Sequence, residues 1–244
     1  MSTQRIRLLS YNIHKGFKLG NWSYVLEDIR LAIRETRADI VFLQEVQGQH
    51  NEKGIGPQFE FLADGIWSHY AYGQNAVYTE GHHGNAILSQ FPILENWNID
   101  LSQNRFERRG LLGARVEIPK IGQLALMTTH MDLLESSREL QIRKIIGTAR
   151  EKMGLELPLI FAGDFNDWRG MIRKELEENL RIKEAFYETQ GDFAKSFPSL
   201  FPLLRLDRVY YRGLKVLSSQ CLTGSKWREL SDHCPLLVEF EIVA

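Results

Sequence analysis

Polar side chains that can bind a metal ion or move a proton follow several short apolar runs in this 244-residue chain. The clearest case is residues 159–167, an apolar run that bends at Gly163 and continues with Asp164, Asn166 and Asp167. Asp164 and Asn166 are two residues apart, so in extended chain their side chains point to the same side. The acid would then serve as an oxygen ligand or a base beside an amide donor for an anionic oxygen. A plain turn before a helix that Asp167 caps is the alternative.

Polar residues also end other runs that read as buried strands. They are Asn12, Glu45, His130, Asp164, Asn166, Asp207, Asp232 and His233. Many acidic oxygens with few histidines favour a hard cation, Mg²⁺ or Mn²⁺, over zinc. The sequence has no zinc-ligand spacing, nucleophile elbow, Walker motif or Rossmann glycine pattern. The remaining chemistry is attack on a phosphoester by water activated near a metal ion.

The elements that must position these residues alternate between strands and helices, so we expect one mixed α/β domain over residues 1–244. Helices are predicted from residue 21, over 136–152 with a capping box at Ser136 and Glu139, and over 168–180. Residues 46–57 and 102–110 are predicted as loops, and 81–85 as a turn. The predicted strands are residues 5–12, 39–43, 67–73, 76–78, 86–89, 93–101, 111–118, 123–129, 159–163, 206–211, 215–221 and 235–242.

Composition places the chain among ordinary globular proteins, with 43% hydrophobic and 25% charged residues. Cys221 and Cys234 have no metal-ligand or redox spacing, the N-terminus lacks an apolar signal core, and no run is long enough to span a bilayer. We therefore expect a cytoplasmic protein without a transmembrane segment, and no protein partner is evident. The formal net charge is −1, so any grip on a polyanion must be local.

The ordered polar motifs resemble the endonuclease/exonuclease/phosphatase superfamily, the DNase I-like proteins. The resemblance implies a four-layer α/β sandwich of two packed mixed β-sheets flanked by helices. It also implies a Mg²⁺- or Mn²⁺-dependent hydrolase of phosphoric esters. The matching stretches occur in the family's order and are residues 9–12, 43–45, 84–89, 129–130, 163–166, 206–209 and 231–236.

The resemblance also assigns roles around the metal ion and the attacking water. Glu45 resembles the principal metal ligand, with Asn12 beside it and Asp232 at or near the metal. Asp164 matches the residue that orients or deprotonates the attacking water, and Asn166 matches the amide that binds the phosphate.

Further residues are expected to face the substrate. His233 resembles a histidine that contacts the scissile phosphate, paired with Asp207, whose carboxylate would orient the imidazole and raise its pKa. His130 matches a second phosphate-facing histidine. Asn85 either closes a turn or reaches the pocket, and Arg109 is either a loop charge or a clamp on a substrate phosphate.

The substrate is less closely defined. Family members that cleave abasic sites carry an acid two residues after the first Asn, where this chain has His14. With Lys15, His14 gives cationic groups that can meet a substrate phosphate. The expected substrate is therefore a phosphodiester, with nucleic acid first and a phospholipid head group or another small phosphoester as the rival. A non-catalytic phosphate-binding scaffold is the alternative outside enzymes.

Overall fold

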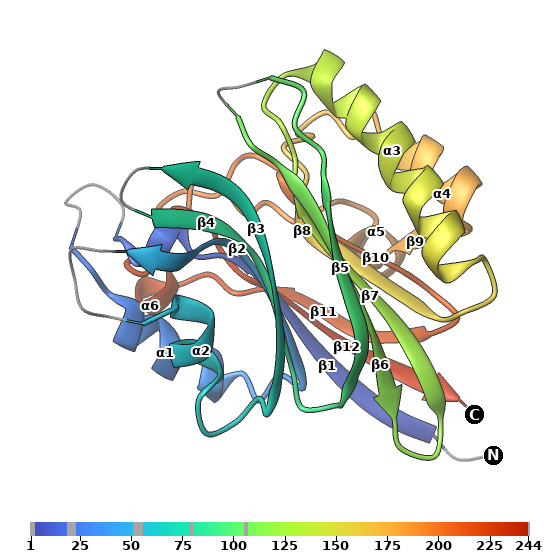
Figure 1. Cartoon of the computed structure of the whole chain (residues 1–244), viewed down its shortest axis with the longest axis horizontal. Coiled ribbons are helices and arrows are strands. Elements are labelled where there is room, and N and C mark those ends of the chain that lie inside the picture. Colours follow the sequence, from blue (N-terminus) through green and yellow to red (C-terminus); the bar gives the residue numbers. More distant parts are fainter. Residues whose placement is uncertain (1–2, 19–22, 51–55, 79–80, 105–106, 244) are drawn as a thin grey trace.

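A computed structural model of the protein describes residues 3–18, 23–50, 56–78, 81–104 and 107–243. Two six-stranded β-sheets pack face to face, with helices on both outer faces (Figure 1). This arrangement confirms the predicted four-layer α/β sandwich. The two ends of the chain lie close together at one end of the molecule, as Figure 1 shows.

The first sheet contains the N-terminal and C-terminal strands. Its members are β1 (Thr3–Asn12), β2 (Ile40–His50), β3 (His69–Tyr78), β4 (Gly81–Ser89), β11 (Lys215–Cys221) and β12 (Leu236–Val243), in the order β11-β12-β1-β2-β4-β3. Helices cover its outer face: α1 (Leu26–Glu35), α2 (Gln58–Ala63) and the short α6 (Ser225–Arg228). A 3-10 turn, η1 (His14–Gly16), follows β1 directly.

The second sheet is built from the middle of the chain. Its strands are β5 (Ile93–Asp100), β6 (Gly110–Ile118), β7 (Gly122–His130), β8 (Leu159–Asp164), β9 (Lys183–Glu184) and β10 (Asp207–Arg212), in the order β5-β6-β7-β8-β10-β9. The long helix α3 (Glu135–Met153) and α4 (Arg173–Leu180) pack on its outer face, and α5 (Ala185–Gln190) lies beside β10 and β11.

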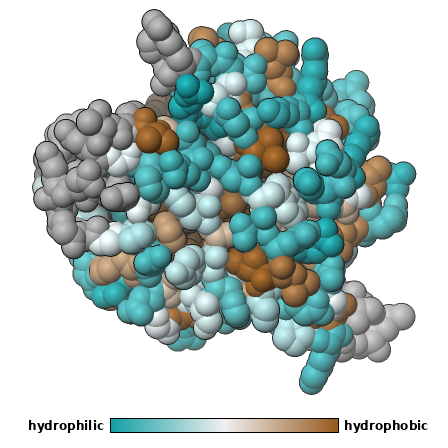
Figure 2. All heavy atoms as spheres, in the orientation of Figure 1, coloured by the Kyte–Doolittle hydropathy of each residue, from teal (hydrophilic) through white to brown (hydrophobic). Residues whose placement is uncertain are grey.

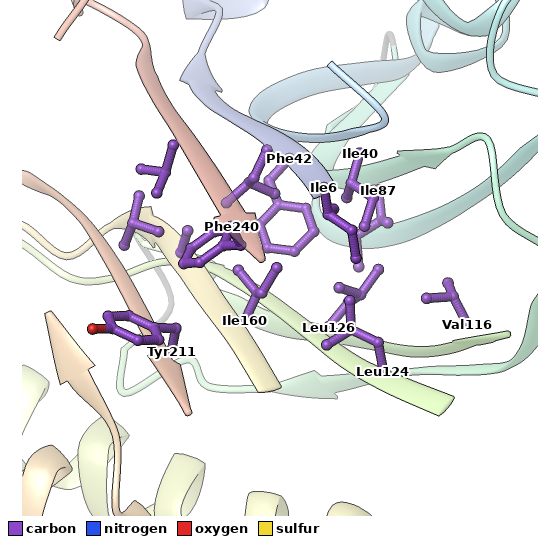
Figure 3. Packing of buried hydrophobic residues seen from close by; sticks show 14 of the residues in the cluster. Ile6, Ile40, Phe42, Ile87, Val116, Leu124, Leu126, Ile160, Tyr211 and Phe240 are labelled. Carbon is purple, nitrogen blue, oxygen red and sulfur yellow. The ribbon is translucent and has the colours of Figure 1, made fainter. Parts of the chain in front are cut away.

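Both sheets are apolar on both faces because each lies between the other sheet and a helical layer. Along β1, Ile6 and Leu8 point into the core between the sheets, whereas Leu9 and Tyr11 point toward the helices. Figure 3 shows side chains of the two sheets meeting in the shared core, with Phe42 and Phe240 from one sheet close to Ile160 from the other.

The direction of the strands brings the polar strand ends to one edge. β1 and β2 are parallel, and β7 and β8 are parallel. β10 runs antiparallel to β8, so the first residue of β10 lies at the edge where β7 and β8 end.

Several predicted boundaries are wrong near this edge. β2 continues to His50, so the loop predicted from residue 46 is shorter, and residues 51–55 lie outside the described residues. The predicted turn at 81–85 belongs to β4, because β2 and β3 pair with it on both sides. The two predicted strands 67–73 and 76–78 form the single strand β3, with a bulge between Gln74 and Ala76.

The predicted helix starts also differ. The helix expected from residue 21 is described from Leu26, and residues 19–22 lie outside the described ranges. The Ser136 capping box does not form, and Asp132 Oδ1 instead accepts from the Leu134 N–H at the helix start (2.9 Å). Asp167 accepts the N–H groups of Met171 and Ile172, so α4 begins several residues later than predicted.

Within the described ranges, no helix combines the length and hydropathy that a membrane span requires. The face drawn in Figure 2 is mostly hydrophilic, with hydrophobic residues in small separate groups.

Candidate active site

The candidate active site lies across the seam between the two sheets. Asn12 at the end of β1 donates through Nδ2 to Asp164 Oδ2 at the end of β8 (3.2 Å), and the same nitrogen lies 3.4 Å from Glu45 Oε1. His130 and Asp207 are the direct strand neighbours of Asp164. Asn12 and Asp164, which are 152 positions apart in the chain, are therefore hydrogen-bonded neighbours in one site.

The backbone around Glu45 is distorted in a way that aims its side chain. Gln44 and Glu45 together face Asn85 of β4, because the pairing shifts between Leu43 and Val46. Glu45 takes a left-handed backbone conformation (φ 57°) in this bulge. A bulge re-aims one side chain relative to regular alternation. Gln44 points between the sheets to Thr128 Oγ1 (3.0 Å), and Glu45 turns toward Asn12 (3.4 Å).

Three more site residues have left-handed backbones, namely His14 (φ 46°), Lys15 (φ 56°) and Asn166 (φ 50°). Such conformations cost free energy for residues with a side chain, and they gather where function requires a fixed geometry. The Asn166 backbone is held by its own N–H, which donates to Asp164 Oδ1 (3.1 Å).

His233 and Asp207 form a buried ion pair. His233 Nδ1 lies 2.9 Å from Asp207 Oδ2, and the Ser196 hydroxyl donates to the same oxygen. Burial lowers the pKa of His233, but the charges of Asp207 and Asp164 outweigh it and raise that pKa to about 10. His233 is therefore a cation at neutral pH. The Phe197 ring packs against it, with ring centroids 4.9 Å apart.

Asp164 lies between two imidazoles that differ in charge. Its Oδ2 is 3.4 Å from His130 Nε2 and 3.6 Å from His233 Nε2. Burial raises the pKa of Asp164 to about 6, with the charge of Asp207 acting in the same direction and His233 against it. Burial, followed by the charge of Arg109, lowers the pKa of His130 well below its ordinary value, so His130 is neutral. A carboxylate with a pKa near 6 suits a general base at neutral pH.

The three predicted metal ligands supply oxygen atoms of the kind that Mg²⁺ and Mn²⁺ prefer. Carboxylate oxygens of Glu45 and Asp232 both lie near His14 Nδ1, at 4.0 and 3.3 Å. Glu45 also faces the nitrogens of Lys15 (4.0 Å) and His130 (3.8 Å), so its negative charge is only loosely compensated. Asn12 Oδ1 accepts one hydrogen bond, from the His14 N–H, and keeps a second lone pair. The donor set therefore fits a hard divalent cation.

A second group of possible ligand atoms fits a metal less well. Asp164, Asp207 and His233 offer atoms within 4.8 Å of one another. A protonated imidazole has no lone pair for a metal, and the high pKa of His233 keeps it protonated. This group is better described as a hydrogen-bonded base and its charge partners.

The residues predicted to bind substrate are not all equally placed. The Asn166 side chain donates to the Met131 carbonyl (2.9 Å), which leaves one amide hydrogen for a ligand. Asn85 is buried and donates to the Gly110 carbonyl (3.0 Å), and its Oδ1 has no hydrogen-bond partner. Arg109 lies near enough for its charge to lower the pKa of His130.

Sequence reasoning missed several residues around the site. Ser196 lies in no motif that marks it in advance, and Ser231 begins the matching stretch 231–236 but received no role from it. The Ser231 hydroxyl donates to the Asn12 carbonyl (2.7 Å) and contacts Asp232 Oδ1, so it ties the last loop to β1. His83, which precedes Asn85 by two residues on β4, was also missed. Burial and the charge of Lys15 lower its pKa to about 4, with Glu45 acting in the opposite direction.

Three comparisons with known proteins bear on this geometry. YbhP, an uncharacterised protein of Escherichia coli strain K12, is 41% identical over 244 residues, which cover 97% of this chain and 96% of that protein. The structure of an endonuclease/exonuclease/phosphatase from Beutenbergia cavernae matches with a TM-score of 0.83 at 18% identity, covering 98% of this chain and 72% of that one. D. rerio TDP2 complexed with a single-strand DNA product matches with a TM-score of 0.72 at 18% identity, covering 97% of this chain and 98% of that one.

A sequence model of one family covers most of the chain. It matches residues 9–233, a range that includes every residue of the candidate site described above. Members of this family hydrolyse phosphoric esters. The chain belongs to the Endonuclease/Exonuclease/phosphatase family.

Proposed function

We propose that the protein is a divalent-metal-dependent phosphodiester hydrolase in which Asp164 activates the attacking water. The observation that carries this proposal is the position of Asp164, a carboxylate with a pKa of about 6 between neutral His130 and cationic His233. Of the oxygen donors, Asn12 contacts both this carboxylate and Glu45, and His14 lies within 4.0 Å of both Glu45 and Asp232.

In the proposed reaction, the water oxygen attacks phosphorus and its proton passes to Asp164 Oδ2. The bond from phosphorus to the ester oxygen breaks on the opposite side, in line with the attack. His233, held by Asp207, supplies a positive charge to the phosphoryl oxygens, and Asn166 offers its remaining amide hydrogen. A divalent ion held by Glu45, Asn12 and Asp232 would stabilise negative charge on the oxygens of the phosphate.

Nucleic acid is one candidate substrate class. The zebrafish TDP2 structure with a DNA product supports it, because that protein has the same fold. The basic residues Lys15 and Arg109 beside the site, with the His14 imidazole, provide the local grip that a chain with a net charge of −1 needs. A phospholipid is a second candidate, because large apolar side chains surround the same edge of the sheet.

Hydrolysis of bis-p-nitrophenyl phosphate tests the proposal without assuming a natural substrate. We expect activity with Mg²⁺ or Mn²⁺ that EDTA abolishes, and a loss of about a hundredfold or more in Glu45→Ala and in His233→Ala. Glu60→Ala, an exposed acid on α2, is the matched control. Activity that persists in EDTA, or near-normal turnover in either site variant, would contradict the proposal. A wild-type protein without hydrolytic activity on any phosphodiester would favour the non-catalytic scaffold.

A further inference from the structure

Large apolar side chains gather at the catalytic edge. Among the described residues, eight exposed ones lie in three loops: the loop after β7, the loop after β8 and the segment that precedes β10. All three loops leave the second sheet at the edge that carries Asp164, as the strand directions require. We call these side chains the apolar rim: Leu133, Leu134, Trp168, Met171, Leu200, Phe201, Leu203 and Leu204.

Half of the apolar rim, namely Leu200, Phe201, Leu203 and Leu204, lies on one hairpin-like segment over residues 197–204. Phe197 and Leu204 pair across its base, where the N–H groups of Leu203 and Leu204 donate to the Phe197 carbonyl (2.9 and 2.8 Å). Phe201 at its far end is 73% exposed. A large aromatic side chain in water is unfavourable unless something covers it in use.

The base of this segment contacts the catalytic pair. Ser196 donates to Asp207, and the Phe197 ring packs on His233. The Ser199 N–H donates to the Asp232 carbonyl (2.7 Å). Whatever covers Leu200 and Phe201 is therefore held next to the phosphate position of the proposed reaction.

The other half of the rim is joined to the site in the same way. Arg138 donates to the Leu133 carbonyl (2.6 Å), and its guanidinium lies 5.3 Å from the centre of the Trp168 ring. Asn166 bonds the Met131 carbonyl, two residues before Leu133. The half of the rim that contains Leu133 and Trp168 is therefore tied to the loop after Asp164, and the half that contains Leu200 and Phe201 is tied to His233.

The charge pattern indicates what covers the rim. Residues 196–204 carry no charge, and the first charged residues on either side are the cations Lys195 and Arg205. Lys195 is exposed, and Arg205 is half-buried beside Asp192 (2.6 Å). Asp192 compensates the charge of Arg205, so Lys195 supplies the positive charge behind the tip. Apolar side chains at a tip with basic side chains behind them match the order of a membrane surface, which has hydrocarbon below and phosphate head groups above. Nucleic acid would instead favour cations at the tip.

We propose that the apolar rim inserts into a phospholipid surface and brings lipid head groups to the catalytic site, so that the substrate is a phospholipid phosphodiester. This assignment rests on the proposed phosphodiester hydrolase activity. Ser196 and Phe197 at the base of the rim contact Asp207 and His233, so head groups of lipids under Phe201 would lie beside this pair.

Vesicle binding tests the surface separately from the activity. The probe is flotation with vesicles of phosphatidylethanolamine and phosphatidylglycerol. We expect the wild-type protein to float with the vesicles and Leu200→Gln/Phe201→Gln to lose at least about tenfold in binding. The matched control is Leu31→Gln/Leu94→Gln, which removes two exposed leucines from α1 and β5 and should bind as the wild type does. Thermal unfolding of each variant verifies that it is folded.

Hydrolysis then tests the substrate class. We expect release of a water-soluble phosphate ester from the vesicles, and the ratio of vesicle hydrolysis to bis-p-nitrophenyl phosphate hydrolysis should fall at least about tenfold in the rim variant.

Wild-type protein that does not float, or a folded rim variant that floats as well as the control, overturns the proposal that the rim binds membranes. Rim-dependent binding without lipid hydrolysis overturns the substrate, and so does hydrolysis of DNA in its place. Rim-dependent dimerisation without flotation assigns the rim to a second copy of the chain. Absence of bis-p-nitrophenyl phosphate hydrolysis is the separate failure of the proposed function.

Discussion

At the scale of single residues, burial and the charges of neighbouring groups set the pKa values of the two histidines and of Asp164. Asp207 gives His233 its high pKa, and His233 in turn limits how far burial raises the pKa of Asp164. His130, close to Asp164 but near the charge of Arg109, stays neutral. The two imidazoles can thus act differently although both contact the same carboxylate.

The ion pair predicts the effect of one substitution. Asp207→Asn removes the carboxylate that holds His233 protonated, so we expect turnover to fall by about a hundredfold and the free energy of unfolding to fall by about 3 kcal/mol. Asp192→Asn, at an exposed ion pair with Arg205, should change both quantities little. Steady-state kinetics and urea denaturation measure the two effects. Equal behaviour of the two variants would show that the His233 contact is not functional.

Metal binding provides a second prediction at this scale. Glu45→Gln keeps the shape of the side chain and removes the charge that faces His14 and Lys15. We expect at least a tenfold weaker affinity for Mn²⁺ by calorimetry, because a hard cation prefers a carboxylate to an amide. Thermal unfolding without metal should change little, since Glu45 is only partly buried. Unchanged Mn²⁺ affinity would place the metal elsewhere.

At the scale of elements, close contact between β7 and β8 places His130 beside Asp164. Gly163 lies opposite Thr129, and a Cβ atom added to it would lie 2.0 Å from the Thr129 carbonyl oxygen. No side chain can be accommodated there without moving a backbone. The last residues of the two strands, which belong to the site, would move with it.

Two glycine substitutions test this point. We expect Gly163→Ala to lower the free energy of unfolding by more than about 2 kcal/mol and to reduce activity, because the strands must separate. Gly147→Ala is the matched control, since nothing lies within 4 Å of its added Cβ in α3. This change should stabilise the protein by about 0.5 to 1 kcal/mol through helix propensity. Urea denaturation gives both values, and a harmless Gly163→Ala would contradict the packing described.

The sequence predicted most strands and the residues at their ends, because buried apolar runs followed by polar residues are visible in one dimension. It could not predict the bulge at Glu45, which depends on pairing with Asn85. It also missed the role of Ser196, since the hydroxyl becomes a partner of Asp207 only when the segment before β10 folds back. The late start of α4 has the same cause, because Asp167 bonds N–H groups four and five residues ahead.

At the scale of the whole molecule, burial of a charge makes stability depend on pH. Glu184 accepts the N–H groups of Tyr187 (2.7 Å) and Val209 (3.3 Å) where β9 meets β10. Burial raises its pKa to about 7, against the effect of these hydrogen bonds and of Arg208. Because this folded-state pKa exceeds the ordinary value of 4.5, the contribution to stability is complete below pH 4.5 and is lost as the pH rises through about 7.

Glu184→Gln removes this titration. Between about pH 5 and about pH 8, the free energy of unfolding of the variant should therefore rise by about 2 kcal/mol relative to the wild type. Urea denaturation at the two pH values measures this double difference. Glu188→Gln, at a more exposed acid that pairs with Lys183, should show a much smaller one. A wild type that becomes more stable than Glu184→Gln as the pH rises would reverse the sign and refute the argument.

Because the candidate site lies between the two sheets, its geometry depends on the position of one sheet relative to the other. Asn12 and Glu45 belong to one sheet, and His130 and Asp164 to the other, so the packing between the sheets, together with the Asn12–Asp164 and Gln44–Thr128 hydrogen bonds, keeps the two halves of the site in register. A slight sliding of one sheet over the other would leave every strand intact and yet abolish the proposed hydrolytic activity. Loss of turnover at low urea, ahead of any change in circular dichroism, would be the signature of that uncoupling.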